Sequence, residues 1–434
     1  MIHDPRFAVV SATLGVVMLA ACESASSPEP LDVRLSVADV WSGGEATLVS
    51  AAFAPPSGLP LVRLAGDTLV VRRVDDSTVA AGLPDGNGPY ALEVLAPGFA
   101  PSTAQVILHG FLSSEDGPVL SGFLQPIPGQ PWVLGAGDPG LVEVNVRTGA
   151  VLRQWPDTVH SPDCTWGVGP SVRAGHYVLF GKAAGGGCSH PWVWQYGAQL
   201  VRLDSLSAAE DVWAVAEVGP GGAISGADDH LFISHCDSAG CTNQPYYYLG
   251  GSLTGTTIAP VARRAVLHHW NRLVVNAQTG DTLYRLRLPS QGYRIEGAAF
   301  SAAEDTVYAV GSEGVPESHL VMALSATGTL LDTLALPGVA AMDVARDPTR
   351  SWIYVAALEG GNVTLVVPQL IVLEQGTLAP VAVLRAPATA ALSLTRWHQF
   401  RIVPAADAVF VVATAQLYDL HGLRAKILRF SLIP

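Results

Sequence analysis

The hydrophobic positions of this 434-residue chain fall in short runs that turn residues interrupt. Runs such as Leu61–Leu64 and Thr78–Gly82 are bounded by clusters of Gly, Pro, Ser and Asp. Short apolar runs between turn signals are typical of β-strands, whereas an amphipathic helix needs a longer stretch with a helical period. The pattern therefore predicts an all-β protein.

Closely spaced strands are predicted over residues 31–112. We expect them at Asp32–Val37, Ala46–Ala51, Leu61–Leu64, Thr68–Arg73, Thr78–Gly82, Tyr90–Leu95 and Ala104–Leu108. Turn signals such as Pro84-Asp85-Gly86-Asn87-Gly88 separate these runs. Several short strands at this spacing are typical of a small immunoglobulin-like sandwich.

The order of motifs within this block resembles the IPT/TIG family of immunoglobulin-like domains. The matching stretches are Gly43-Gly44, Val62-Arg63-Leu64-Ala65-Gly66-Asp67, Asp76-Ser77-Thr78-Val79, Leu83-Pro84 and Gly88-Pro89-Tyr90-Ala91-Leu92-Glu93-Val94. The resemblance covers most of the block. It implies a spacer or binding module rather than a catalyst.

Two kinds of strand unit recur over residues 113–434. A strand–Thr-Gly–strand unit surrounds Thr148-Gly149, Thr279-Gly280 and Thr327-Gly328. A second unit pairs two apolar strands across a polar turn, in residues 298–310, 342–356 and 400–412. Strand-only units with a period of about 40–47 residues are typical of a β-propeller, and the available length gives about seven blades. A long β-sandwich or a β-helix is the alternative.

The hairpins of this second block resemble those of YVTN and quinoprotein-like propellers. The resemblance lies in the strand–Thr-Gly–strand units, and the chain lacks the recurring Gly-His and Trp-Asp marks of WD40 repeats. Quinoprotein dehydrogenases of this kind carry a vicinal cysteine pair and repeated tryptophan motifs, and the chain has neither. The resemblance therefore implies a propeller without a quinone cofactor, and we expect no cofactor.

The first residues resemble a bacterial lipoprotein signal peptide. An apolar run over residues 7–21 follows Arg6 and ends in Leu19-Ala20-Ala21-Cys22, like a lipobox. The run is short for a bilayer span but suits a signal peptide over residues 1–21. The resemblance implies that Cys22 becomes the lipidated N-terminus and that its acyl chains anchor the protein. A plain secretory signal with a chance cysteine is the alternative.

Two further expectations concern where the anchored protein lies. Glu23 is not the aspartate that marks inner-membrane retention, so we expect an outer-membrane location on the periplasmic or the surface face. Residues 22–30, rich in Ser, Pro and Glu, have too few apolar side chains to fold and are predicted to be a disordered tether.

Charge excludes one class of partner. The formal net charge is −13, charged residues make up 14% of the chain, and Lys182 and Lys426 are its only lysines. Nucleic-acid binding requires a basic surface that neutralises phosphates. We therefore expect no nucleic-acid partner.

Four cysteines follow the lipobox: Cys164, Cys188, Cys236 and Cys241. An even number in an exported protein is most simply explained by two disulfides, of which the nearest-neighbour pairing is one of three connectivities. The alternative is a metal site made by Cys164, Cys188 and His190, with His235 and Cys236. Because the spacing lacks the paired Cys-x-x-Cys of structural zinc sites, we expect disulfides and no metal.

The candidate ligand-binding residues are aromatic. They lie within or beside the two cysteine-containing inserts and are Trp166, Trp192, Trp194, Tyr196, Tyr246, Tyr247 and Tyr248. Aromatic side chains on a rigid framework suit sugar or protein surfaces, although packing between strands explains them equally well. The polar–aromatic segments 268–271 and 397–399 could line a central channel or pack between sheets.

No catalytic residue is predicted. The sequence contains no Gly-x-Ser-x-Gly elbow, no His-Glu-x-x-His and no phosphate loop. Asp228, Asp229, His230 and His235 could hold a cation, but a polar turn explains them more simply. We therefore expect a non-catalytic envelope lipoprotein whose propeller is a binding or scaffolding platform for protein or glycan ligands. A metal-dependent lactonase, a lyase or a quinoprotein-like dehydrogenase is the alternative.

Overall fold

The computed structural model describes most of the chain after residue 27. The described residues are 28–55, 58–127, 129–137, 140–155, 165–171, 176–181, 192–196, 202–207, 212–219, 222–227, 230–237, 240–248, 255–268, 272–277, 279, 281–289, 293–313, 318–360, 365–392, 397–415 and 424–433. The predicted signal peptide and Cys22 lie outside this set. Within it, no helix is long and apolar enough to cross a membrane.

The chain divides into two compact units. The first contains Met1–Ala38, Glu45–Leu83 and Pro89–Ile107, and the second contains Asp39–Gly44, Pro84–Gly88 and Leu108–Pro434. The described strands are almost the only regular structure in both, as an all-β protein requires.

Two sheets occupy the N-terminal block. Their orders are β2-β4-β8-β7 and β3-β11-β9-β5-β6, and β1 pairs in parallel with β10. The elements are β1 (Glu29–Pro30), β2 (Arg34–Leu35), β3 (Asp39–Trp41), β4 (Glu45–Val49), η1 (Ala51–Phe53), β5 (Leu61–Leu64), β6 (Asp67–Thr68), β7 (Val71–Arg73), β8 (Thr78–Gly82), β9 (Gly88–Leu95), β10 (Phe99–Ala100) and β11 (Ser102–His109). Alternate residues such as Ala46 and Leu48 on β4, or Leu92 and Val94 on β9, are buried, which is the two-residue period of strands with one face on a core.

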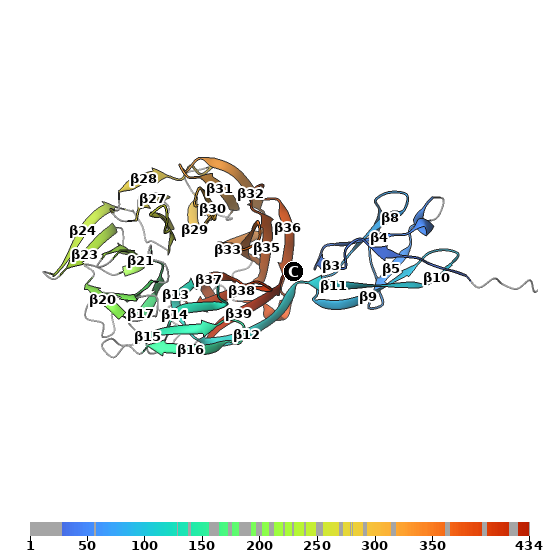
Figure 1. Ribbon diagram of the computed structural model, residues 1–434, viewed down its shortest axis with the longest axis horizontal. Helices are drawn as coiled ribbons and strands as arrows, with labels where there is room; N and C mark the ends of the chain where they lie inside the picture. The colour runs from blue at the N-terminus through green and yellow to red at the C-terminus, as the bar shows by residue number, and fades with distance from the viewer. Residues whose placement is uncertain are drawn as a thin grey trace, which may run out of the picture. The chain divides into compact units, whose positions relative to one another are not determined.

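The second unit is built from groups of four strands arranged in a ring (Figure 1). The strands are β12 (Phe111–Val119), β13 (Ser121–Pro126), β14 (Trp132–Gly137), β15 (Gly140–Asn145), β16 (Ala150–Trp155), β17 (Thr165–Gly169), β18 (Tyr177–Gly181), β19 (Trp192–Tyr196), β20 (Arg202–Ser207), β21 (Val212–Gly219), β22 (Gly222–Ala227), β23 (His230–Asp237), β24 (Gly240–Tyr248), β25 (Gly255–Ala259), β26 (Arg264–His268), β27 (Leu273–Asn276), β28 (Thr282–Arg285), β29 (Arg294–Phe300), β30 (Thr306–Glu313), β31 (Ser318–Ser325), β32 (Leu330–Leu336), β33 (Val339–Arg346), β34 (Trp352–Glu359), β35 (Val367–Glu374), β36 (Pro380–Arg385), β37 (Trp397–Pro404), β38 (Ala408–Ala415) and β39 (Arg424–Ser431), with a short helix η3 (Ala388–Ala390). Six groups use consecutive strands, from β13–β16 to β33–β36, and all pairings within them are antiparallel. The first strand of each group faces the centre, and these inner strands are β13, β17, β21, β25, β29, β33 and β37.

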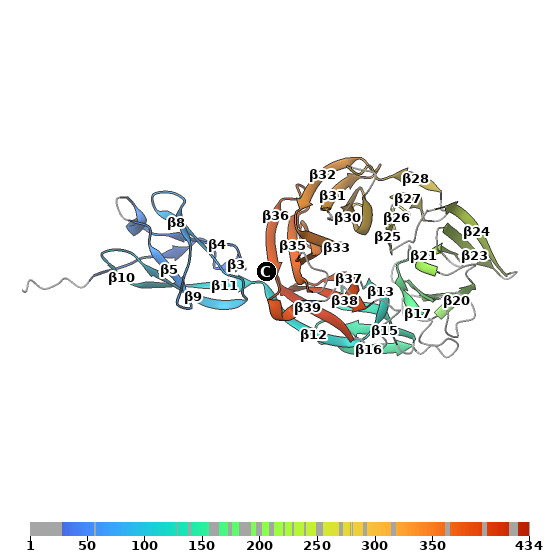
Figure 2. The ribbon, with the colours of Figure 1, turned by 180° about the vertical axis from the view of Figure 1, so that it is seen from behind.

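The remaining group closes the ring with strands from both ends of the unit (Figure 2). It joins β37, β38 and β39 to β12, which pairs antiparallel with β39 from Phe111↔Phe430 to Val119↔Arg424. The predicted boundary between residues 112 and 113 falls inside β12. A closed ring leaves no open sheet edge at the junction of its first and last strands.

The recurring sequence units occupy equivalent hairpins of the ring. The Thr148-Gly149 turn joins β15 to β16, and the Thr327-Gly328 turn joins β31 to β32. Gly149 and Gly328 have φ of 66° and 78°, a left-handed conformation that glycine adopts without steric cost. The second kind of sequence repeat, two apolar strands joined by a polar turn, forms the first hairpin of three groups. These hairpins are β29–β30, β33–β34 and β37–β38.

Hydrogen bonds fix the turn between β33 and β34 at Asp347, whose side chain is buried. Its carboxylate accepts the N–H groups of Thr349 and Arg350, at 2.7 and 2.6 Å, and the hydroxyl of Tyr354. Burial alone would raise the pKa of Asp347, but these hydrogen bonds outweigh it and lower the pKa below its ordinary value. This turn is therefore held rigidly in its charged form.

The hydrophobic core lies between neighbouring groups. One cluster joins Val310 and Val321 of the β29–β32 group to Val344, Val355 and Ile371 of the β33–β36 group. Because each group packs its apolar faces on both neighbours, the strands of the ring read as nearly continuous apolar runs.

Candidate functional site

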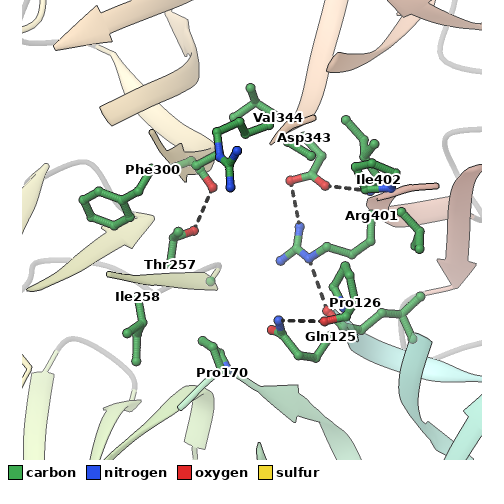
Figure 3. A pocket seen from close by; sticks show the side chains of 18 of the residues that line it. Gln125, Pro126, Pro170, Thr257, Ile258, Phe300, Asp343, Val344, Arg401 and Ile402 are labelled. Carbon is green, nitrogen blue, oxygen red and sulfur yellow. Dashed lines mark hydrogen bonds and ion pairs between the residues drawn. The ribbon is translucent and has the colours of Figure 1, made fainter. Parts of the chain in front are cut away.

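A cavity of about 350 Å³ lies where the inner strands of the ring finish (Figure 3). Its lining comes from the inner strands β13, β17, β25, β29, β33 and β37, together with His268 of β26. Ile127, Pro170 and Pro348 lie in the loops that follow inner strands, so the cavity extends to that face of the ring. A volume in this range suits a small-molecule ligand.

A buried ion pair crosses the cavity wall between β33 and β37. Asp343 is 6% exposed, and its Oδ1 lies 3.4 Å from Nη1 of Arg401. Its Oδ2 accepts the backbone N–H of Ile402 at 2.9 Å. Figure 3 shows the two side chains pointing toward each other from their neighbouring strands.

Burial raises the pKa of the Asp343 carboxyl above its ordinary value, although the Arg401 guanidinium and the N–H groups of Ile402 and Val344 act in the opposite direction. A carboxylate and a guanidinium inside a low-dielectric wall each need the other to offset the loss of hydration. The pair therefore fixes the position of Arg401 at the cavity.

His268 and Thr257 form a second polar contact at the wall. The Thr257 hydroxyl donates to the carbonyl oxygen of Ala298 at 2.9 Å and lies 2.8 Å from Nε2 of His268. A hydroxyl has one proton, so its oxygen accepts and the His268 proton is on Nε2. Burial, together with the charge of Arg401, lowers the pKa of His268 to about 3, so the ring is neutral at pH 7.

Replacing His268 with glutamine is expected to make the protein more resistant to acid. The folded-state pKa of His268 lies below its unfolded value of 6.5, so the unfolded state binds more protons and stability falls as the pH drops from 6.5 toward 3. From pH 6.5 to 5 this residue should account for a loss of about 2 kcal/mol.

The measurement is the free energy of unfolding in urea at both pH values, for wild type and His268→Gln. The contribution of Asp343 is common to both proteins and cancels in the difference. Equal pH dependence of the two proteins would contradict the buried, neutral state of His268.

Two inner-strand glycines allow the wall to pack this closely. A Cβ on Gly255 would lie 2.6 Å from Nδ1 of His268 and 3.4 Å from Nη2 of Arg401. A Cβ on Gly297 would lie 2.9 Å from Oδ1 of Asp343 and 3.0 Å from its Cα. The missing side chains at these positions therefore leave the space that the polar groups of the cavity occupy.

The rest of the lining is mostly apolar, with one further cation. Apolar side chains from six of the inner strands contribute, among them Ile258, Phe300, Val344, Ile402 and Val403. Arg346, at the end of β33, lines the cavity and donates from Nη1 to the carbonyl oxygen of Asp347 at 2.9 Å. The chain thus offers an apolar cavity with a few fixed polar groups, which is the usual composition of a ligand site.

The aromatic residues predicted to bind ligand lie on three strands of the ring. The structure places Trp166 on β17, then Trp192, Trp194 and Tyr196 on β19, and Tyr246, Tyr247 and Tyr248 on β24. They belong to two neighbouring groups of the ring. Their backbones are in strands rather than in the inserts, as the alternation of aromatic and other residues in Trp192–Tyr196 favours.

The predicted disulfides have one structural counterpart. The register of β23 and β24 places Cys236 directly opposite Cys241 in the antiparallel ladder. Cys164 and Cys188, like Cys22, lie outside the described residues, so both disulfides stay predictions. Within the described part of the chain, no three His, Cys, Asp or Glu side chains are grouped so that they could hold a metal ion.

Sequence reasoning missed the residues that form the cavity. Asp343 and Arg401 fall inside the recurring hairpin units, where they read as polar positions of a repeat. The available signal was a charged residue within an otherwise apolar inner strand. The segment that contains His268 was expected to line a channel or to pack between sheets, and His268 lines the cavity with a residue exposure of 2%.

Comparison with solved structures identifies the fold of the ring. The β-propeller domain of Cps50 (Swd1) from Myceliophteria thermophila is similar over 75% of this chain and all of its own length, with a TM-score of 0.53 and 10% sequence identity. The second unit is therefore a β-propeller. No protein-family model matches the chain, and no curated protein matches it in sequence.

Proposed function

We propose that this chain is a lipid-anchored, non-catalytic binding platform of the bacterial envelope, with protein or glycan ligands. In this proposal Cys22 carries the lipid, residues 22–30 are the tether and the outer membrane is the site of attachment. The β-propeller fold suggests a binding or scaffolding role, because such rings present loops and cavities on a rigid frame.

The proposal includes a finer architecture. The two N-terminal sheets form an immunoglobulin-like module of the IPT/TIG kind that acts as a spacer. The four-stranded groups form a seven-bladed propeller, whose last blade takes its outer strand from β12. The sheet orders and the antiparallel pairing of β12 with β39 support this assignment.

The observation that carries the proposal is the cavity among the inner strands. Its polar groups are held by hydrogen bonds and an ion pair within the protein, so the cavity exists without a ligand to organise it. A preorganised site binds without the loss of conformational freedom that a flexible one incurs.

The alternative of a propeller enzyme finds less support in this cavity. A buried carboxyl with a raised pKa, such as that of Asp343, is the kind of group that can act as a general acid. Both oxygens of Asp343 are engaged, however, one by Arg401 and the other by the N–H of Ile402. Its geometry suits the positioning of Arg401 better than proton transfer.

Affinity purification of the tagged full-length chain after crosslinking in its own envelope is expected to recover a partner in near-equal amount. Replacing Trp192, Trp194 and Tyr196, or the three tyrosines of Tyr246–Tyr248, with serine should reduce that recovery, because aromatic side chains dominate binding surfaces. The readout is mass spectrometry of the crosslinked material.

The matched control replaces exposed apolar residues elsewhere on the propeller. Val261 and Leu331 are 87% and 60% exposed, and their change to serine should leave partner recovery as it is in wild type. Recovery of the chain alone, from intact envelopes and with no glycan attached, would overturn the proposal.

A further inference from the structure

The charged residues that line the cavity carry more positive than negative charge. Among the described lining residues they are Arg346, Arg401 and Asp343, and His268, which also lines the cavity, is neutral at pH 7. With Asp343 ionised, the described part of the lining has a formal excess of one positive charge. This excess stands out in a chain whose own net charge is −13.

Both guanidinium groups have N–H donors to spare. Arg401 donates from Nε to the carbonyl oxygen of Leu124, at 3.3 Å. Its Nη1 donates to Asp343 and to the carbonyl oxygen of Phe400. Its Nη2 has no acceptor among the described residues and lies 3.4 Å from the position of a Cβ on Gly255. Within the described part of the chain, Arg346 donates only from Nη1, to the carbonyl oxygen of Asp347. A guanidinium has five N–H donors, so each arginine can still donate to a ligand.

The contacts of Arg401 hold it in place for such a ligand. It is 15% exposed, and its bonds to β13, β33 and β37 span three inner strands. A guanidinium fixed in a partly dry wall donates charge-assisted hydrogen bonds to an oxyanion at little cost in side-chain entropy. The geometry of the cavity therefore favours an anionic ligand group.

The surroundings restrict that anion further. A single excess positive charge balances a monoanion, whereas a phosphate dianion would leave negative charge uncompensated inside an acidic protein. Apolar side chains such as Val344 and Ile402 flank the arginines, so the body of the ligand meets a mostly apolar wall. The volume of about 350 Å³ admits a molecule of small organic size.

We propose that the cavity binds a small organic carboxylate, with Arg401 and Arg346 as the donors to its carboxylate group and Asp343 as the residue that positions Arg401. This inference rests on the proposed binding function and names the ligand chemistry of the cavity. The carboxylate can belong to an acidic sugar of a glycan or to a free aliphatic acid, and the two sources share the same recognition.

Isothermal titration of the detergent-solubilised full-length chain at pH 7 and low ionic strength tests the proposal. The probes are glucuronate with glucose as its neutral counterpart, hexanoate with hexanol, and inorganic phosphate. We expect saturable binding of at least one carboxylate, no binding of its neutral counterpart, and weakening by added salt. Glucuronate binding identifies an acidic-sugar source, and hexanoate binding without glucuronate binding identifies an aliphatic one.

Three variants test the assigned residues. Arg346→Gln should weaken carboxylate binding by about tenfold or more, as expected for the loss of hydrogen bonds to a charged group. The double variant Asp343→Asn with Arg401→Gln removes both buried charges together, which preserves folding, and should abolish binding. The matched control Arg385→Gln changes a half-exposed arginine paired with Glu359 outside the cavity, and should bind as wild type does.

Several results would overturn the inference. These are equal binding of glucose and glucuronate, phosphate binding tighter than either carboxylate, no binding of any carboxylate, or unchanged binding in both cavity variants. If the chain captures an envelope partner but binds no carboxylate, this inference is wrong and the proposed function stands. Failure of both experiments would remove the proposed function as well.

Discussion

Replacing Arg401 with leucine is expected to lower the free energy of unfolding by about 3–5 kcal/mol at pH 7. The substitution leaves the Asp343 carboxylate, which is 6% exposed, with only the backbone N–H groups of Ile402 and Val344 as compensation among the described residues. A buried charge that loses its partner must either stay poorly solvated or take up a proton. Urea denaturation of the full-length chain measures the loss.

The pH dependence of Arg401→Leu distinguishes this cause from simple loss of packing. Without Arg401, the folded-state pKa of Asp343 rises further above its unfolded value, so the folded state binds more protons in the window between the two. Stability then falls as the pH rises through that window. Since each pH unit corresponds to about 1.4 kcal/mol for one proton, the loss should be clearly smaller at pH 5 than at pH 7.

Two further proteins serve as controls for this prediction. The double variant Asp343→Asn with Arg401→Leu should be more stable at pH 7 than Arg401→Leu alone, because it removes the buried charge. Arg385→Leu breaks a half-exposed pair with Glu359 and should change the free energy of unfolding by about 1 kcal/mol or less. A loss in Arg401→Leu that does not vary with pH would show that Asp343 is not its cause.

The repeat that reveals the ring is local, which is why the sequence predicts it. Each hairpin unit carries its own turn chemistry, such as the Thr-Gly turn at Gly328 or the Asp347 turn, and its own apolar strands. These signals act within about a dozen residues, the range over which sequence patterns are most informative. The β-propeller predicted from them is the fold that the structural comparison shows.

The cavity depends on contacts that no local pattern contains. Asp343 and Arg401 are 58 residues apart, and Arg401 meets the carbonyl of Leu124 across 277 residues. A single sequence shows a charged residue in an inner strand but does not show which strand faces it. The aromatic residues were chosen because side-chain chemistry is visible in a sequence, whereas the arrangement of inner strands is not.

The closure of the ring was hidden for the same reason. Strand β12 has mostly exposed positions, with the sequence Phe-Leu-Ser-Ser-Glu-Asp-Gly-Pro-Val, and reads as a linker. Its partner β39 combines buried apolar residues with Arg424, Lys426 and Arg429, and lies near the other end of the chain. The pairing of β12 with β39 explains why such a polar segment forms a strand. Backbone hydrogen bonds and the Asp116–Lys426 ion pair hold β12 against β39.

The closure has an apolar anchor at Phe430. This side chain is fully buried, and its ring lies 5.6 Å from that of Phe111 at an interplanar angle of 73°, an edge-to-face contact. Phe111 is at the start of β12, so the contact fixes the strand where it enters the ring. The same Phe430 belongs to a core cluster with Tyr354 and Phe400.

Replacing Phe430 with alanine is therefore expected to lower the free energy of unfolding by about 3–5 kcal/mol, the usual effect of truncating a buried phenylalanine. Because the lost contact anchors β12, hydrogen exchange of the β12 amides should accelerate more than that of β34. Leu336→Ala, which truncates a buried side chain in the β29–β32 group, is the matched control and should destabilise the protein without this selective change. Uniform acceleration throughout the propeller in Phe430→Ala would show that the ring opens as one cooperative unit and that β12 is not its weakest closure.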